Sequence, residues 1–241
     1  MPNENYSILS TKPLADSLIA EANRYGVHIR CEAFIKTLPV INAAMQQKIK
    51  ALANTSAYVV FTSTSGVLAV ANHYLPADSK GSKAPGWKIF CLETATLQEV
   101  QEHFSKEQVL ATAGYGKHLA QHIIQHGKVD KVLFFCGNQR RDELPGMLRE
   151  NGITVEEYVV YETIATPVKD TTHYDGILFF SPSAVKSFFS QNTLAPSTVC
   201  FAIGTTTADA LRAFTSNKII ISTATSAEQM VQTTVSYFEQ Y

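Results

Sequence analysis

Side chains that could bind an anion recur where apolar runs of the sequence end. Small hydroxyl, amide and glycine residues follow six such runs, each ahead of a helical pattern: Ser10–Pro13, Thr62–Ser65, Thr94–Thr96, Gly137–Gln139, Ser181–Ser183 and Gly204–Thr207. Each loop would present backbone N–H groups and the positive end of a helix dipole, to which a carboxylate can bind. At any single loop, hydroxyl side chains that only cap a helix are the simpler interpretation. Six loops together favour a large polyanionic ligand.

Basic side chains near the same loops could add ion pairs to such a ligand. The candidates are Lys12, Arg140, Arg141 and Lys186. For Arg140 and Arg141, a solvated first helical turn competes evenly with carboxylate binding. The acidic residues that follow, Asp142 and Glu143, suit a helix N-terminus on dipole grounds alone.

Tyr161 is a further candidate, in the segment Val159–Thr163. Its phenol could face a ligand cleft or take part in packing where the chain crosses between domains. Spacing does not choose between them, although packing is the commoner fate of such a ring.

Other kinds of site find little support. The sequence has neither a G-x-x-x-x-G-K-[ST] nor a G-x-G-x-x-G phosphate loop, and no G-x-S-x-G surrounds Ser63 or Ser183. His118, His122 and His126 recur every four residues, but no H-E-x-x-H accompanies them, so we interpret them as a solvated helix flank. We expect no bound metal.

The elements that must position these loops alternate regularly along the chain. Ten short apolar runs are expected strands: Tyr6–Ser10, Val27–Cys31, Ala57–Thr62, Trp87–Leu92, Gln108–Thr112, Lys131–Cys136, Ile153–Tyr158, Tyr174–Phe180, Thr198–Ile203 and Lys218–Ser222. Helical spacing between them includes Ala15–Ala22, Met45–Leu52, Leu119–Ile124 and Ala208–Phe214. Continuous apolar strands are typical of parallel sheets covered on both faces, which predicts an α/β fold with open, doubly wound sheets whose loops share one carboxyl edge.

An internal repeat predicts two domains. Val60–Val67 resembles Leu178–Val185, and Phe90–Thr96 resembles Phe201–Thr207. The order of the matches indicates one domain inserted into another, with residues 1–34 and 163–241 as domain I and residues 35–162 as domain II. The chain would cross twice, near Glu32–Pro39 and Val159–Pro167, as a two-stranded linker beside a ligand cleft.

Composition narrows the class of protein. The 241 residues are 45% hydrophobic and 17% charged, with a formal net charge of −1, so neither nucleic acid nor membrane binding is expected. The N-terminal sequence lacks a signal-peptide pattern. None of Cys31, Cys91, Cys136 and Cys200 forms a C-x-x-C, which favours buried reduced thiols. We expect a cytoplasmic protein, monomeric because no spare amphipathic stripe is visible.

Several segments together resemble the uroporphyrinogen-III synthase family. They are Val132–Pro145 with Leu148 and Gly152, Val160–Thr163, Phe180–Val185, Ala202–Ala208, Ile8–Gly26 and Phe61–Val67. No single motif is decisive, but their order and spacing are specific and cover essentially the whole chain. Two departures are Glu93, where the family often has glycine, and Lys12, where arginine is frequent.

The resemblance implies two flavodoxin-like domains and a cofactor-free lyase. Its substrate would be hydroxymethylbilane, a linear tetrapyrrole with eight carboxylates, which is dehydrated and cyclised with inversion of ring D through a spiro intermediate. Tyr161 would be the catalytic residue. The residues implied for substrate binding are Lys12, Thr62, Ser63, Ser65, Gly137, Asn138, Arg140, Ser181, Pro182, Ser183, Ala184, Gly204, Thr205, Thr206 and Thr207. A transient contact with the enzyme that makes hydroxymethylbilane is also expected.

Two other functions fit the same pattern of elements. One is a non-catalytic two-domain module that binds a small anionic ligand as a sensor or carrier, because fold alone does not separate it from an enzyme. The other is a nucleotide-dependent transferase, which the absence of glycine fingerprints disfavours.

Overall fold

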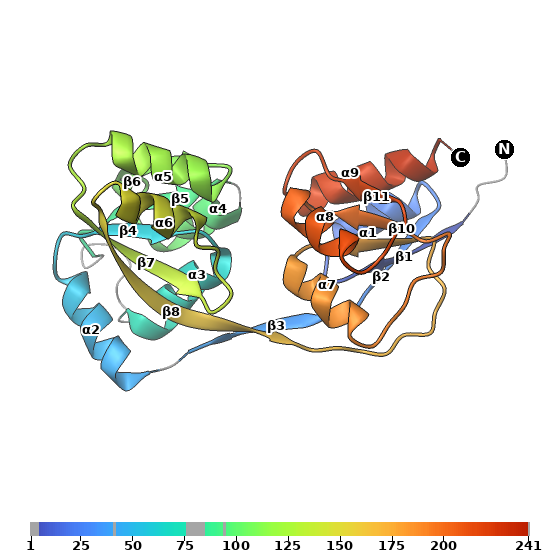
Figure 1. The fold of residues 1–241 in the computed structure, drawn as a ribbon, viewed down its shortest axis with the longest axis horizontal. Coiled ribbons are helices and arrows are strands. Elements are labelled where there is room, and N and C mark those ends of the chain that lie inside the picture. Colours follow the sequence, from blue (N-terminus) through green and yellow to red (C-terminus); the bar gives the residue numbers. More distant parts are fainter. Residues whose placement is uncertain (1–4, 41, 76–84, 94, 241) are drawn as a thin grey trace. The chain divides into compact units, whose positions relative to one another are not determined.

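The chain divides into two compact units in the computed structural model, which describes residues 5–40, 42–75, 85–93 and 95–240 (Figure 1). Unit 1 comprises Met1–Lys36 and Ile164–Tyr241, and unit 2 comprises Thr37–Thr163. Unit 2 therefore interrupts unit 1 along the chain.

Unit 1 is built on a five-stranded parallel sheet in the order β11-β10-β9-β1-β2. Its strands are β1 (Tyr6–Ser10), β2 (Val27–Cys31), β9 (Gly176–Phe179), β10 (Val199–Ala202) and β11 (Ile219–Ile221). Its helices are α1 (Asp16–Asn23), α7 (Pro182–Phe189), α8 (Thr205–Arg212) and α9 (Ala227–Phe238).

Neighbouring residues of each unit 1 strand enter different cores. Ile8 and Leu178 pack with apolar residues of α1 and α9, whereas Leu9 and Phe179 pack with those of α7 and α8. Helices thus cover both faces of the sheet, which explains why these strands are continuously apolar in sequence.

Unit 2 has a six-stranded sheet in the order β3-β8-β7-β4-β5-β6. Its strands are β3 (Ile35–Pro39), β4 (Tyr58–Phe61), β5 (Lys88–Leu92), β6 (Val109–Ala113), β7 (Lys131–Gly137) and β8 (Thr154–Ala165). Its helical segments are α2 (Ala43–Ala53), α3 (Thr64–Ala69), the π-helix η1 (Val70–Tyr74), α4 (Ala95–His103), the 3₁₀-helix η2 (Lys106–Gln108), α5 (Gly116–Gln125) and α6 (Glu143–Glu150).

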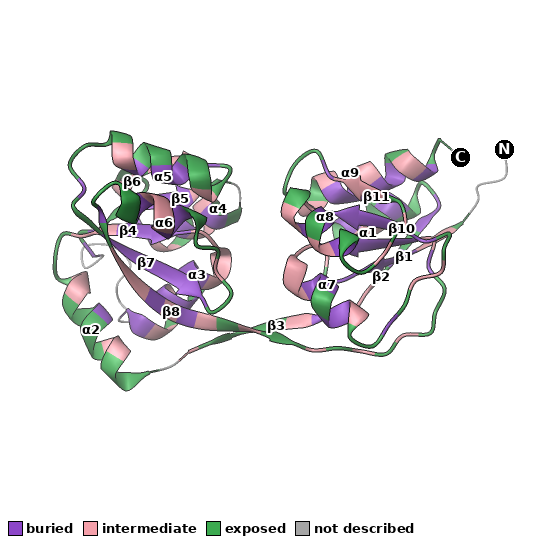
Figure 2. Ribbon diagram, in the orientation of Figure 1, coloured by how far each residue is buried: buried purple, intermediate pink, exposed green. Residues whose placement is uncertain are grey.

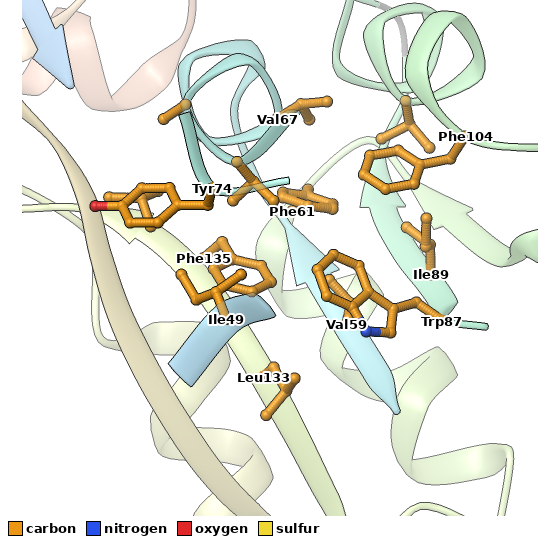
Figure 3. Packing of buried hydrophobic residues seen from close by; sticks show 14 of the residues in the cluster. Ile49, Val59, Phe61, Val67, Tyr74, Trp87, Ile89, Phe104, Leu133 and Phe135 are labelled. Atoms are coloured by element: carbon orange, nitrogen blue, oxygen red, sulfur yellow. The ribbon is translucent and has the colours of Figure 1, made fainter. Parts of the chain in front are cut away.

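Aromatic rings fill the core on one face of the unit 2 sheet. The rings of Phe61 and Phe135, on the adjacent strands β4 and β7, stack with centroids 5.5 Å apart, and Trp87 lies 5.6 Å from Phe135 (Figure 3). The alternate residues Val60 and Phe134 pack on the other face against α5 and α6. Both faces of this sheet are therefore buried as well.

The sequence predicts the segment of β3 as one strand of a two-stranded linker, with Glu32–Pro39 beside Val159–Pro167. In the structure it pairs with β8: the Val40 N–H donates to the Val160 carbonyl and the Thr166 N–H to the Phe34 carbonyl, both at 3.0 Å. Residue numbers rise along one strand as they fall along the other, so this pair is antiparallel.

The α/β class with two parallel sheets is confirmed, with β3 as the one antiparallel strand among those described, and each of the ten predicted strands overlaps an observed one. Figure 2 shows the burial that this implies, with buried strands and exposed outer helix surfaces. Cys91, Cys136 and Cys200 are buried and Cys31 is half-buried. None of the helices in the described ranges has the length and apolarity needed to cross a bilayer.

A buried hydroxyl in unit 1, that of Ser187, is expected to lower the stability of the protein. Ser187 on α7 is 2% exposed, and among the described residues its Oγ has no hydrogen-bond partner. We expect Ser187→Ala to raise the free energy of unfolding by about 1 kcal/mol, because it removes an unsatisfied polar group and places a better helix former in α7. Urea denaturation measures this.

The matched control for Ser187→Ala is Ser190→Ala. The Ser190 Oγ donates to the Ser187 carbonyl at 2.7 Å from an exposed position, so its removal should leave stability equal or slightly lower. A lower urea midpoint for Ser187→Ala than for the unsubstituted protein would contradict the prediction.

Candidate active site

A hollow of about 120 Å³ opens on unit 2. Its walls come from β3, α3, η1 and β8, and the residues that line it are Thr37, Leu38, Pro39, Ser65, Leu68, Ala69, Asn72, His73 and Tyr161. Two of the residues singled out from the sequence, Ser65 and Tyr161, are thus brought together in one cavity.

Tyr161 reaches the hollow through an irregularity in β8. Cys136 pairs with Val159, but the next residue of β7, Gly137, pairs with Tyr161, so Val160 is an extra residue in the ladder. Such a β-bulge re-aims the side chains that follow it. Val160 is buried in the aromatic core, and regular alternation would turn Tyr161 to the opposite face; instead both pack against the same core.

Gly137 makes room for the phenol of Tyr161. A Cβ atom added to Gly137 would lie 2.5 Å from Cζ, 2.6 Å from Cε2 and 2.8 Å from the hydroxyl oxygen of Tyr161. All three separations are shorter than van der Waals contact, so a side chain at position 137 is incompatible with this ring position. Gly137 itself is buried, so its part in the site is to seat Tyr161.

Ser63 holds the other side of the phenol. Its Oγ accepts the Gly66 N–H at 3.1 Å as the N-cap of α3, and its hydroxyl also interacts with that of Tyr161 in a way that favours the phenolate. The predicted capping role of Ser63 is confirmed, and its contact with Tyr161 is additional to it. Neighbouring Thr62 is half-buried.

The environment keeps Tyr161 protonated. Burial raises the pKa of Tyr161, while the hydrogen bond from Ser63 acts in the opposite direction. At neutral pH the group is therefore a neutral phenol, which can donate a hydrogen bond or a proton to an oxygen atom in the hollow. The adjacent Cys136 thiol is also protonated, because burial raises its pKa to about 11.

The loop after β7 does not lead directly into a helix, contrary to the sequence prediction. The helix α6 starts only at Glu143, and its N-cap Asp142 makes no side-chain capping bond. Instead the loop is tied to β8: the Asn138 Oδ1 accepts the Thr163 N–H at 3.0 Å, and the Gln139 Nε2 donates to the Thr163 carbonyl at 3.1 Å. A turn that serves the neighbouring strand cannot be read from composition.

Arg140 forms ion pairs within its own chain. It contacts both carboxylate oxygens of Glu157, one at 2.8 Å, and Asp142 at 2.8 Å. Arg149 also pairs with Glu157. A substrate carboxylate would have to displace these internal partners, so the structure disfavours Arg140 as a binding residue.

In unit 1, Lys12 lies beyond the end of β1. Its ammonium is 4.4 Å from the ring centroid of Phe180, which follows the adjacent strand β9. Burial of the amine lowers the pKa of Lys12, and the nearby Glu228 raises it. The sequence predicted that hydroxyls of this loop cap α1, and this is wrong. The Thr11 hydroxyl instead donates to the Leu178 carbonyl at 2.8 Å, and α1 has no side-chain cap.

The two other predicted loops of unit 1 differ in what they offer a ligand. At α7, Ser181 caps the helix by accepting the Ala184 N–H at 3.1 Å, Pro182 has no N–H, and Ala184 is buried. Ser183 is half-buried.

At α8 the N-cap is Gly204, so no side chain caps this helix. Thr205 is exposed and Thr206 is half-buried. The Thr207 N–H donates to the Gly204 carbonyl at 3.1 Å, and its side chain is buried. The accessible donors at this helix end are thus those of Thr205 and Thr206.

The remaining candidates fall outside the hollow. His118, His122 and His126 are exposed along α5 and at its C-cap, as predicted. No group of three or more His, Cys, Asp or Glu residues within the described ranges could hold a metal ion. The Glu93 carboxylate turns toward β6, where Thr112 donates to it at 3.4 Å. Thr94, from the loop predicted at Thr94–Thr96, lies outside the described residues.

Sequence reasoning did not select the other seven residues that line the hollow: Thr37, Leu38, Pro39, Leu68, Ala69, Asn72 and His73. The first three are on β3, and the other four are on α3 and η1. His73 is isolated along the chain, and nothing in the sequence signals the π-turn on which it lies.

A family model described as uroporphyrinogen-III synthase HemD matches residues 16–232 of this chain. A curated protein of Chlorobaculum parvum named uroporphyrinogen-III synthase is 26% identical over 221 residues, which are 85% of this chain and 88% of that protein.

Solved structures show the same fold. The uroporphyrinogen-III synthetase of Helicobacter pylori is 16% identical, with a TM-score of 0.67, and the match covers 96% of this chain and 99% of that one. A mutant uroporphyrinogen III synthase of Thermus thermophilus is also 16% identical, with a TM-score of 0.65 and coverage of 98% and 99%.

The contact between Gly137 and Tyr161 makes a testable prediction. Gly137→Ala should destabilise the protein by about 1–3 kcal/mol, because a methyl group overlaps the phenol ring. In a Tyr161→Ala background the same change should have little effect, since the ring is gone, so urea denaturation of the four proteins should reveal coupling. Gly146→Ala in α6 is the control: its added Cβ meets only the Asp142 Oδ2 at 3.4 Å, so stability should be unchanged or higher. Equal stability of Gly137→Ala and Gly146→Ala would refute the contact between Gly137 and Tyr161.

The hydrogen bond from Ser63 makes a second prediction, on acidity. Ser63→Ala should raise the pKa of Tyr161, because the bond that stabilises the phenolate is lost while burial remains. Ser63→Thr keeps a hydroxyl and should leave the pKa nearer its original value. The measurement is phenolate absorbance against pH, with the corresponding Tyr161→Phe protein subtracted in each case. A pKa that stays constant or falls in Ser63→Ala would show that Ser63 does not donate to Tyr161.

Proposed function

The chain belongs to the uroporphyrinogen-III synthase family, and we propose that it converts hydroxymethylbilane into uroporphyrinogen III. The reaction is that of a hydro-lyase: one water leaves, ring D inverts through a spiro intermediate, and the macrocycle closes. It is redox-neutral and joins two carbons of one molecule, so its balance needs no cofactor.

The task of the protein in this reaction is largely positional. Hydroxymethylbilane also closes without enzyme, but it then gives isomer I. An enzyme must therefore hold a flexible chain in the one geometry that inverts ring D, and orientation of this kind can supply much of a rate enhancement. Dispersed hydrogen-bond donors with a few fixed groups suit that task better than a dense catalytic triad.

The observation that carries the proposal is the setting of Tyr161. A neutral phenol faces the hollow, seated on Gly137 and oriented by Ser63. We assign to Tyr161 the hydrogen bond or proton that the departing hydroxyl of the substrate requires. Because an ordinary phenol has a pKa of about 10 and burial raises it here, Tyr161 assists departure and is not an absolute requirement.

The substrate carboxylates would bind at strand ends in each unit. In unit 1 we propose Lys12 by its charge, and Thr205 and Thr206 by the N-terminus of α8. In unit 2 we propose Ser65, which lines the hollow. Ser63 and Gly137 would position Tyr161, and Asn138 would hold β8 through the Thr163 N–H, so these three contribute indirectly. The monomeric state and the contact with the enzyme that makes hydroxymethylbilane stay predictions.

Isomer analysis tests the proposed function. The protein is coupled to an enzymatic source of hydroxymethylbilane, and the products are oxidised to porphyrins and separated. Isomer III in the presence of the protein, and isomer I in its absence, is the expected result. Isomer I alone in both reactions would reject a synthase and leave a non-catalytic binding module as the better interpretation.

Substitution of Tyr161 tests its part in the reaction. Tyr161→Phe should lower the turnover of isomer III by about 10- to 100-fold while leaving the fold intact, because the ring still fills the space above Gly137 but has no hydroxyl. Tyr115→Phe, at an exposed ring of the same unit, is the control. Unchanged turnover of Tyr161→Phe, with an unchanged melting temperature, would remove Tyr161 from the mechanism.

A further inference from the structure

We propose that His73 is a second proton-transfer residue of the reaction, acting in the hollow of unit 2 together with Tyr161. The inference rests on the proposed function and adds to it a residue that no sequence pattern selects.

The position of His73 is fixed by an unusual stretch of helix. The π-helix η1 continues directly from α3, and the Leu75 N–H donates to the Val70 carbonyl at 3.0 Å, five residues back. Wide turns of this kind are rare in proteins, and those that do occur often lie at functional sites. The Gln46 Nε2 donates to the His73 carbonyl at 2.9 Å, so α2 holds this backbone in place. The half-buried His73 thus lines the hollow that Tyr161 also lines.

The reaction needs a proton donor that works near neutral pH, and Tyr161 is not such a donor. Loss of a hydroxyl at neutral pH is best assisted by a donor that titrates near neutrality. Burial moves the pKa of Tyr161 away from that range. Thr37, Ser65 and Asn72 can form hydrogen bonds but do not exchange protons near pH 7. Among the described residues that line the hollow, imidazole is the side chain suited to that exchange.

The walls of the hollow match the part of the substrate that must be held. Leu38 and Leu68 are 36% and 38% exposed, and together with Pro39 and Ala69 they give the hollow an apolar surface. About 120 Å³ accommodates a small flat ring with its substituent. A pyrrole in this hollow would lie against these walls, with Tyr161 and His73 lining the same space.

The proton balance of the reaction closes with one such residue. The C–O bond of the hydroxymethyl group breaks, the oxygen takes a proton from the imidazolium of His73, and water leaves while the pyrrole electrons stabilise the cation. The cation bonds to the substituted α-carbon of ring D and forms the spiro intermediate, and the older bond from that carbon to its bridge carbon then breaks. The freed bridge carbon bonds to the other α-carbon of ring D, which releases its proton. The neutral imidazole accepts it and returns to its starting state, so no other reactant is consumed.

Two substitutions test the proposal in the full chain. We expect His73→Gln to lower kcat for isomer III by about tenfold or more while KM changes less than about twofold, because glutamine can form a hydrogen bond but cannot transfer a proton. We expect His73→Ala to lose activity similarly and to regain part of it when imidazole is added to the assay. His118→Gln, on the exposed face of α5, is the matched control and should retain full activity.

The outcomes separate failure of this inference from failure of the proposed function. If the unsubstituted protein forms isomer III but His73→Gln keeps kcat within about twofold, His73 transfers no proton and the inference is wrong. A loss that appears only in KM, or that imidazole does not relieve in His73→Ala, would also overturn it. If the unsubstituted protein forms isomer I alone, the proposed function itself fails. Melting temperatures of all variants distinguish lost chemistry from lost folding.

Discussion

The candidate site depends on one steric constraint, the absence of a side chain at Gly137. The phenol ring of Tyr161 occupies the volume that a Cβ atom would need, and this contact fixes the ring against the carboxyl end of β7. The hydrogen bond from Ser63 then orients the hydroxyl. Without the space at Gly137 or the hydroxyl of Ser63, the Tyr161 side chain would lose the contacts that define its position. The geometry of the site is therefore a property of three strand ends, β4, β7 and β8, that are neighbours in one sheet.

The same residues serve folding and chemistry at this sheet edge. Ser63 caps α3 and contacts the phenol, while Phe61 and Phe135, each two residues before Ser63 and Gly137, stack in the core beneath them. Burial of these rings anchors the strand ends, so small polar residues just beyond them are held with little freedom of their own. A site that positions a flexible substrate benefits from donors whose conformational entropy is already lost on folding.

Much of the fold was predictable because its signals are local. Continuous apolar strands, helical spacing between them and the repeat of Val60–Val67 with Leu178–Val185 predict parallel sheets without long-range information. The site was only partly predictable. Ser63, Ser65, Gly137 and Tyr161 could be selected from the sequence, but His73 and Leu68 could not, because no local pattern indicates the π-helix or shows that α3 and η1 line one hollow with β3 and β8. The role of Arg140 was equally hidden, because Glu157, its partner, is 17 residues away on another strand.

The register shift between β7 and β8 bears on how this protein can change in evolution. Exchange of one apolar residue for another at Val159 or Val160 preserves the direction of every later side chain in the strand. Loss of the one extra residue would restore a regular ladder with Tyr161 still opposite Gly137, on the face that it already occupies. Natural variants should therefore tolerate a segment that is one residue shorter here, and an alignment with a one-residue gap at the bulge would still mark proteins that have the tyrosine in the same place.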